Sequence, residues 1–243
     1  RSYHRLLLPP QEEAVFMRAI IFANGEFHPP QNGFGALQPS DVIIAVDGGA
    51  RHCAQFGLLP HIVIGDFDSL TQAELHDLVT RGVQVVRFPV RKDFTDLELA
   101  VHHALGLGCR KIQIFGALGA RWDQTLANLL LLSSPALENV AVSLVDDNQE
   151  ITLLRPERTE RLSGKPGETL SLIPLAGDAK GIVTRGLEYP LHHETLQLGS
   201  TRGVSNVFTE PEATIIFEQG LLLCTVIHQP TRPASHVDQI LIR

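Results

Sequence analysis

The sequence is poor in cysteine, in positive charge and in long apolar runs, and each shortage argues against a class of protein. Its three cysteines, Cys53, Cys109 and Cys224, are far apart and form no Cys-x-x-Cys pair. This spacing argues against a disulfide framework and against a structural zinc site. We therefore expect an intracellular, cytoplasmic protein with buried thiols.

Positive charge is scarce, because 20 Lys and Arg stand against 27 Asp and Glu, a formal net charge of −7. No stripe of Lys and Arg is present that could neutralise a row of phosphates, which argues against a nucleic-acid partner. The longest apolar patch, at residues 129–132, is far too short to cross a membrane. An acidic protein can still bind a polyphosphate when a divalent cation lies between the two sets of negative charges.

The two ends of the chain are expected to add little to the fold. Residues 1–16 precede the only methionine, Met17, and their short leucine run breaks at two prolines. They are therefore typical of an upstream extension or a cloning remnant rather than of a signal peptide. Residues 231–243 are expected to form a loosely attached tail.

Short apolar runs alternate with helical patterns between residues 17 and 148. Apolar side chains at 97, 100, 101, 104 and 105 have the i, i+3, i+4, i+7, i+8 spacing of an amphipathic helix. Apolar strands separated by such helices indicate an α/β fold, a mostly parallel sheet with helices on both faces. The expected strands are residues 19–22, 42–46, 62–64, 83–88, 111–115 and 140–145, and the expected helices are residues 74–80, 96–107 and 124–132.

The pattern changes after residue 148. Gly and Pro interrupt short strand-like runs and helical periodicity is absent, which predicts a smaller all-β sandwich or barrel. The expected strands are residues 169–174, 181–185, 195–198, 213–218 and 221–227. We therefore expect an α/β domain over residues 17–148, followed by a smaller all-β sandwich domain over residues 149–230.

Acidic residues follow four successive predicted strands. Ligands of open α/β sheets bind at the carboxyl ends of the strands, so polar residues at these places are candidate ligands. Gly48 and Gly49, which follow Asp47, allow the backbone to turn sharply beside a ligand. The six carboxylates expected at this edge are Asp47, Asp66, Asp68, Asp93, Asp96 and Asp123.

These aspartates have two interpretations. A single Asp after a strand is most often a helix cap or a turn residue, and Thr95 with Glu98 fits a capping box nearby. Capping does not explain Asp66 and Asp68, two residues apart beside a glycine. Six gathered carboxylates repel one another unless a hard cation such as Mg²⁺ binds them. The sequence therefore predicts a magnesium-assisted site for phosphate chemistry.

Tyr189 and the loop at residues 199–206 also have two interpretations. They could form two ordinary surface turns. They could equally form an aromatic face with small hydroxyl and amide groups, from Ser205 and Asn206, that suits a flat, cationic heterocycle.

Five motifs in this order resemble the thiamine pyrophosphokinase family. They are DGG at 47–49, GDFDS at 65–69, KDxTD at 92–96, GxxGxRWDQ at 116–124 and GxxxGxSN at 199–206. Gln124 stands where many bacterial members have His. The resemblance spans roughly residues 19–228 and implies transfer of pyrophosphate from ATP to the hydroxyl of thiamine, giving thiamine diphosphate and AMP, with Mg²⁺ as cofactor.

The resemblance also implies a role for each candidate residue. It implies a homodimer, with thiamine between the α/β domain of one subunit and the β domain of the other. Asp47, Asp66, Asp68 and Asp96 would surround Mg²⁺ and the triphosphate, and with Arg121 they form the expected catalytic set. Asp93, Arg121, Asp123 and Gln124 would position ATP, while Tyr189, Ser205 and Asn206 would lie near the thiamine rings.

Two other functions fit part of the same pattern. One is a pyrophosphokinase for another heterocyclic alcohol, such as a pterin, and Tyr189 with its neighbouring loop argues for thiamine instead. The other is a non-catalytic sensor of nucleotide or thiamine. Such a sensor would be expected to lack the metal aspartates or Arg121, and this chain retains them all.

Overall fold

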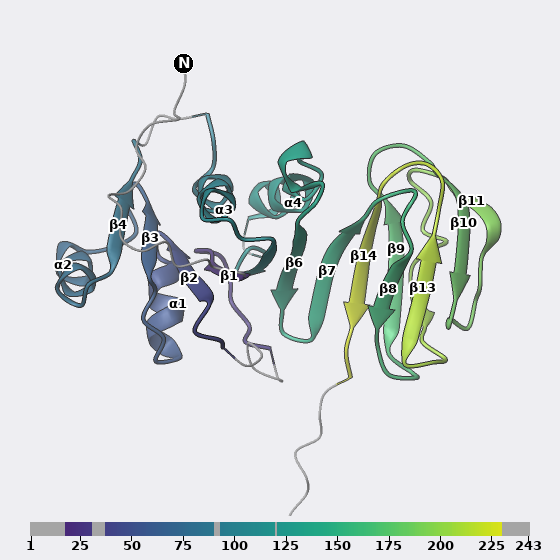
Figure 1. Ribbon diagram of the computed structural model, residues 1–243, viewed down its shortest axis with the longest axis horizontal. Helices are drawn as coiled ribbons and strands as arrows, with labels where there is room; N and C mark the ends of the chain where they lie inside the picture. The colour runs from purple at the N-terminus through teal and green to yellow at the C-terminus, as the bar shows by residue number, and fades with distance from the viewer. Residues whose placement is uncertain (1–17, 31–36, 90–92, 120, 230–243) are drawn as a thin grey trace, which may run out of the picture.

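The structure, a computed structural model, describes residues 18–30, 37–89, 93–119 and 121–229 (Figure 1). The extension expected at 1–16 and the tail expected at 231–243 lie outside these residues. The described chain forms a mixed α/β fold with a ten-stranded sheet and a separate four-stranded antiparallel sheet.

Six parallel strands make up the first part of the large sheet, in the order β4-β3-β2-β1-β5-β6. They form because their residues are apolar in short continuous runs, and β2 is buried along its whole length. All six were expected at these places. They are β1 (Arg18–Phe22), β2 (Asp41–Val46), β3 (Ile62–Gly65), β4 (Gln84–Arg87), β5 (Lys111–Phe115) and β6 (Ala141–Asp146).

Helices cover both faces of these parallel strands, as expected. Helices α1 (Gly49–Gln55) and α2 (Gln72–Thr80) bury Cys53 and Leu78 against one face. Helices α3 (Asp96–Gly106) and α4 (Trp122–Leu131) bury residues such as Leu97 against the other. Helix α1 was not predicted, because its seven residues follow two glycines and make fewer than two turns. A short 3₁₀ helix, η1 (Pro135–Leu137), connects α4 to β6.

The strands after residue 148 extend the same large sheet and also build the second one. A tight turn at Asp147, which has a φ of 49°, reverses the chain, so β7 pairs antiparallel with β6. The two halves of the chain therefore share one continuous sheet (Figure 1). The large sheet gains β7 (Gln149–Leu154), β14 (Leu222–Ile227), β9 (Thr169–Pro174) and β12 (Asn206–Val207), and the second sheet contains β11 (His192–Leu196), β10 (Ala179–Arg185), β13 (Glu212–Ile216) and β8 (Glu160–Ser163).

Three of these strands, β7, β8 and β12, were not predicted, and β11 begins three residues before the expected position. Strands β8 and β12 have only four and two residues, too few to show an alternating pattern. Leu154, Phe208 and Phe217 are among the residues of a buried apolar cluster in this part of the chain.

Cys53, Cys109 and Cys224 are buried and form no disulfide, as expected. Among the helices in the described residues, none has the length and apolar character needed to cross a membrane.

Candidate functional site

The carboxyl ends of the parallel strands form the edge at which a site is expected. The chain moves outward from β1 to β4 and then returns to β5 on the other side of β1. Ligands of such sheets bind where the strand order reverses, which here is between β1 and β5. Backbone hydrogen bonds of 2.8 Å, from Ala23 to Phe115 and from Gly25 to Gly116, join the two segments that follow these strands.

Asp47 directly follows β2 and is only 6% exposed. Its backbone is left-handed, with a φ of 47°, and its N–H donates a 2.8 Å hydrogen bond to the carbonyl of Ile64. A Cβ on Gly48 would meet only the movable end of a side chain, Asn24 Oδ1 at 2.1 Å. A Cβ on Gly49 would lie 2.0 Å from the backbone carbonyl oxygen of Phe22, so Gly49 has to be glycine for reasons of space. The DGG motif therefore allows a tight turn that packs Asp47 against β3 and the loop after β1.

Asp66 and Asp68 lie in the turn after β3. Phe67, between them, is buried, and the guanidinium of Arg87 lies 4.8 Å from its ring centroid. Arg87 also donates a 3.0 Å hydrogen bond to the carbonyl of Asp66. Asp66 Oδ1 accepts a 3.1 Å hydrogen bond from the backbone of Asp68. The buried ring thus anchors a turn that carries a carboxylate on each side.

Asp47, Asp66 and Asp68 each bring one carboxylate oxygen within 4.8 Å of the others, an arrangement that could hold a metal ion. Burial raises the pKa of Asp47, hydrogen bonding with Ser69 lowers it, and the neighbouring Asp68 and Asp66 raise it further. Asp47 Oδ1 is buried and has no hydrogen-bond partner within the described structure. A buried, unpaired carboxylate oxygen beside two more carboxylates is costly unless a cation binds there. The donor set fits a hard cation such as Mg²⁺.

Asp96 is the first residue of α3, and Asp93 lies three residues before it. The expected cap is present, because Thr95 Oγ1 accepts a 3.2 Å hydrogen bond from the backbone of Glu98. The carboxylate group described above contains neither Asp93 nor Asp96, as far as the described residues go. A metal-binding role for Asp96 therefore stays a prediction.

Arg121, Asp123 and Gln124 are exposed at the start of α4. The Arg121 guanidinium bonds both oxygens of Asp123, with Nε 3.1 Å from Oδ1 and Nη2 paired with Oδ2. This hydrogen bonding lowers the pKa of the Asp123 carboxyl. Arg121 can therefore bind a phosphate only by sharing its charge between Asp123 and the ligand, or by exchanging partners.

Tyr189 and Asn206 meet in the second half of the chain. Asn206 Oδ1 accepts a 3.0 Å hydrogen bond from the Tyr189 backbone, and Asn206 Nδ2 donates a 2.8 Å bond to the Tyr189 carbonyl. Tyr189 is 63% exposed. Ser205, which directly precedes Asn206, has a left-handed backbone with a φ of 63°. The Asn206 amide thus fastens the Tyr189 turn to β12.

Within one chain, Tyr189 and Asn206 lie far from the three carboxylates. Strand β12 lies seven strand-to-strand steps from β2 in the large sheet. At about 4.8 Å a step, the two strands are roughly 34 Å apart.

Three residues that were not predicted support the site. Asn24 Nδ2 donates a 2.9 Å hydrogen bond to Ser69 Oγ, Arg51 donates one of 2.7 Å to the Ser69 carbonyl, and Asn128 Nδ2 donates one of 2.7 Å to the Ala117 carbonyl. Asn24 follows β1 as the aspartates follow the later strands. The rule that polar residues at the carboxyl ends of strands are candidate ligands could therefore have found it. Arg51 and Asn128 lie within helices and carry no comparable signal.

Comparison with known proteins identifies the family. The model of the thiamin pyrophosphokinase catalytic domain matches residues 35–144, and that of the thiamin pyrophosphokinase vitamin B1 binding domain matches residues 152–222. A Bacillus subtilis (strain 168) protein named thiamine pyrophosphokinase is 32% identical over 180 residues, covering 74% of this chain and 84% of the relative. This chain belongs to the thiamine pyrophosphokinase family.

Solved structures of thiamine pyrophosphokinases share its fold. The crystal structure of thiamine pyrophosphokinase from Bacillus subtilis superimposes with a TM-score of 0.78 at 29% identity, covering 87% of this chain and 99% of that one. The thiamin pyrophosphokinase from Geobacillus thermodenitrificans gives a TM-score of 0.77 at 26% identity, covering 88% and 99%. The family expected from the five motifs is therefore confirmed.

Proposed function

We propose that this chain transfers pyrophosphate from ATP to the hydroxyl of thiamine, producing thiamine diphosphate and AMP. The observation that carries the proposal is the group of Asp47, Asp66 and Asp68, within 4.8 Å of one another, in a chain that matches the catalytic and the vitamin B1 binding family models. The same two matches favour thiamine over a pterin as the acceptor.

Asp47, Asp66 and Asp68 would hold Mg²⁺, with Asp96 joining them from the start of α3. The unpaired Oδ1 of Asp47 and its crowded carboxylate neighbours support a cation there. When bound, Mg²⁺ supplies charge neutralisation for the phosphates and for the aspartates that face them.

The protein side chains mainly position the reactants. The thiamine hydroxyl oxygen bonds to the β-phosphorus of ATP, the bond from that phosphorus to the oxygen bridging to the α-phosphate breaks, and AMP leaves with that oxygen. The hydroxyl proton is lost to a base or to water. ATP would be positioned by Asp93, Arg121, Asp123 and Gln124. The Arg121 guanidinium bonds both oxygens of the Asp123 carboxylate, and the same planar geometry can bind two phosphate oxygens.

The enzyme would act as a homodimer. Tyr189, Ser205 and Asn206 would lie near the thiamine rings, yet β12 is seven strand steps, roughly 34 Å, from β2 in the same chain. Thiamine is much shorter than this separation, so a second copy would have to supply the thiamine-binding side of each site.

Exposed apolar side chains on the outer face of α4 support a contact with a second subunit close to the site. Trp122, Leu126 and Leu130 are 80%, 57% and 53% exposed, respectively. They follow one another at i, i+4 and i+8, so they form one stripe that starts beside Arg121. An apolar stripe of this kind is typical of a protein-protein contact.

We also propose a cytoplasmic location, and a division into an α/β domain at 17–148 and a β-sandwich domain at 149–230. Three unbridged cysteines support the location. The two family models, which end and begin on either side of residue 148, support the division.

Purified protein incubated with ATP, Mg²⁺ and thiamine tests the reaction, with AMP and thiamine diphosphate measured by chromatography. We expect the two products in equal amounts, and no product when a chelator removes the metal. Formation of ADP and thiamine monophosphate instead, or no AMP with thiamine, would overturn the proposal. Faster turnover of a pterin alcohol than of thiamine would favour the alternative function, a pyrophosphokinase for another heterocyclic alcohol.

Mixing two inactive variants tests the shared site. One carries Asp68→Asn and the other replaces Tyr189 and Ser205 with Ala. A symmetric dimer that shares its sites would regain about a quarter of wild-type activity after subunit exchange, since half of the dimers have one intact site. Mixed dimers that form without any gain would place each site within one chain.

A further inference from the structure

Arg155 connects the second half of the chain to the end of helix α4. It directly follows β7 and lies in the stretch that matches the vitamin B1 binding model. Its Nη2 donates hydrogen bonds to the carbonyls of Leu132, at 3.2 Å, and Ser134, at 3.4 Å. Leu132 is the C-terminal cap of α4. A cation is favourable at this place because helix ends leave carbonyls without helical partners and carry partial negative charge.

The other end of α4 carries the residues expected to position ATP. The helix has ten residues, so its ends are about 15 Å apart. Its start has no side-chain cap, and Arg121 and Asp123 are exposed there. Within the helix, Asn128 bonds the Ala117 carbonyl at 2.7 Å. The helix is thus bonded to the loop after β5 along its length and to Arg155 at its end.

We propose that Arg155 is a positioning residue for pyrophosphate transfer, which fixes the end of α4 and so sets where Arg121 and Asp123 meet ATP. This inference rests on the proposed function. A packed helix moves nearly as a rigid body, so release of its end shifts its start as well. The effect should reach the ATP side of the site, because α4 carries ATP-positioning residues, and should spare thiamine binding.

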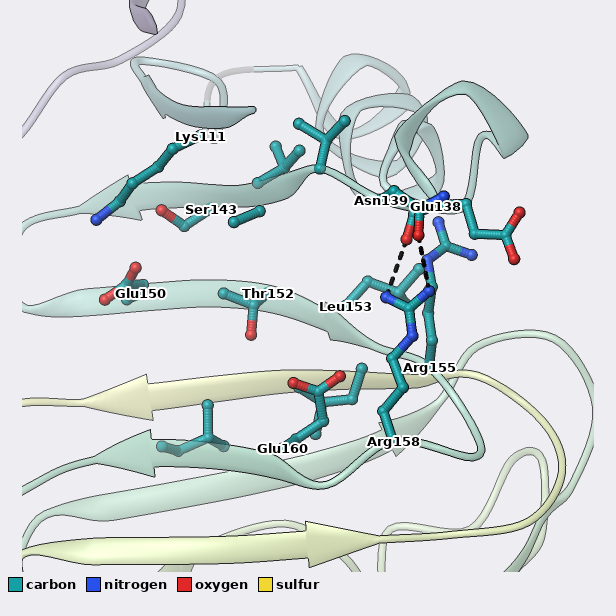
Figure 2. Close-up of a pocket in the computed structure, with 15 residues that line it drawn as sticks. Lys111, Glu138, Asn139, Ser143, Glu150, Thr152, Leu153, Arg155, Arg158 and Glu160 are labelled. Carbon is teal, nitrogen blue, oxygen red and sulfur yellow. Dashed lines mark hydrogen bonds between the residues drawn. The ribbon is translucent and has the colours of Figure 1, made fainter. Parts of the chain in front are cut away.

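Arg158 provides a matched comparison within the same turn. It donates hydrogen bonds to the Glu138 carbonyl at 3.0 Å and to Asn139 Oδ1 at 3.2 Å. Figure 2 shows both bonds as dashed lines and both arginines at one end of a pocket between β6, β7 and β8. Arg158 therefore holds the segment between η1 and β6, whereas Arg155 holds the end of α4.

Kinetics of Arg155→Ala, Arg155→Lys and Arg158→Ala test the proposal. Loss of two charged hydrogen bonds at Arg155 should raise the KM for ATP about fivefold, with the KM for thiamine within about twofold of wild type. Arg155→Lys should recover part of the loss, because an ammonium can still donate to one carbonyl. Arg158→Ala should leave the KM for ATP within about twofold. It should lower the melting temperature less than Arg155→Ala, because its bonds are exposed whereas those of Arg155 are partly buried.

Trp122 gives an independent measurement of ATP binding. It is the only tryptophan of the chain, the first residue of α4 and 80% exposed. Titration with MgATP in the absence of thiamine should change its fluorescence, and Arg155→Ala should weaken the fitted affinity about fivefold. If Arg155→Ala does not fold, Arg155→Gln, which retains a donor amide, takes its place.

Two results would overturn the positioning role. One is an equal change in the KM for ATP in Arg155→Ala and Arg158→Ala, which would indicate a general loss of stability. The other is an ATP affinity unchanged by both Arg155→Ala and Arg155→Gln. Either result in an active wild-type enzyme leaves the proposed function in place, whereas a wild type that forms no AMP from thiamine refutes the proposed function itself.

Discussion

The side-chain amide of Asn128 donates a 2.7 Å hydrogen bond to the carbonyl oxygen of Ala117. Both residues are buried, at 7% and 6% exposure. The bond joins the middle of α4 to the loop after β5, which includes Gly116 and lies beside the loop after β1. Helix and loop are therefore held as one unit at the point where the strand order reverses.

Asn128→Leu should destabilise the protein by about 1–3 kcal/mol, because it leaves a buried carbonyl without its donor. It should also lower turnover, since the loop and the start of α4 lose their common anchor. Chemical denaturation and steady-state kinetics measure the two effects. Ser133→Ala is the control, because it removes an exposed 2.7 Å bond to the Leu130 carbonyl and should change stability by no more than about 0.5 kcal/mol. Equal losses in both variants would contradict an anchoring role.

Asp66→Asn and Asp68→Asn should each abolish turnover and leave the fold intact. Each removes a charged ligand from the group of three carboxylates, and an amide binds a hard cation less strongly than a carboxylate. Circular dichroism checks the fold, and Mn²⁺ binding followed by electron paramagnetic resonance checks the metal site. Asp77→Asn, on the exposed side of α2, should behave as wild type. Near-normal activity in both variants would remove these residues from the metal site.

Asp47→Asn and Asp41→Asn should shift metal-free stability in opposite directions. Both carboxylates are buried, at 6% and 5% exposure, but among the described residues only Asp41 forms an ion pair, with Arg18 Nε 3.0 Å from its Oδ1. Loss of an unpaired charge at Asp47 should raise the melting temperature by about 2 °C, whereas breaking the buried pair at Asp41 should cost about 3 kcal/mol.

Scanning calorimetry with and without Mg²⁺ measures both changes. Wild type and Asp41→Asn should gain stability from the metal, and Asp47→Asn should not. A metal-free Asp47→Asn protein that melts below wild type would show that the carboxylate is already compensated by other groups.

Arg51→Gln should raise the pKa of Glu74, which is about 2 in the wild type, chiefly because of hydrogen bonding from Arg51. A carboxylate whose pKa is lowered in the folded protein stabilises the fold at pH values above its ordinary pKa, which is 4.5 for this glutamate. That contribution is lost as the pH falls toward about 2. The stability difference between wild type and variant should therefore shrink below pH of about 4.5.

Carbon-detected NMR titration of Glu74 measures the shift directly, and urea denaturation across the same pH range measures its effect on stability. Arg81→Gln is the control. Arg81 is an exposed arginine at the end of α2 and pairs with Asp77 at 3.5 Å. It should leave the Glu74 titration unchanged. A Glu74 titration that does not move in Arg51→Gln would assign the low pKa to the Thr71 cap alone.

Local signals in the sequence predicted the strands of the α/β half well, because continuous apolar runs are typical of strands buried on both faces. The short elements escaped prediction for a related reason. Strands β8 and β12 and helix α1 have too few residues to show a period. Asn24 was missed although it follows β1, and Arg51 and Asn128 were missed because their partners lie 18 and 11 positions away.

The sequence by itself determined the family, because five short motifs in order identify it, and it determined the acidic strand ends. Only the tertiary structure decided which of these residues meet. Strand order brings Asp47 to Asp66 and Asp68, while it separates β12 from β2 by seven strand steps. It also brings Arg155 to the end of α4. The physical reason is that periodicity reports which face of an element is buried, whereas pairing between distant strands depends on contacts across the whole chain.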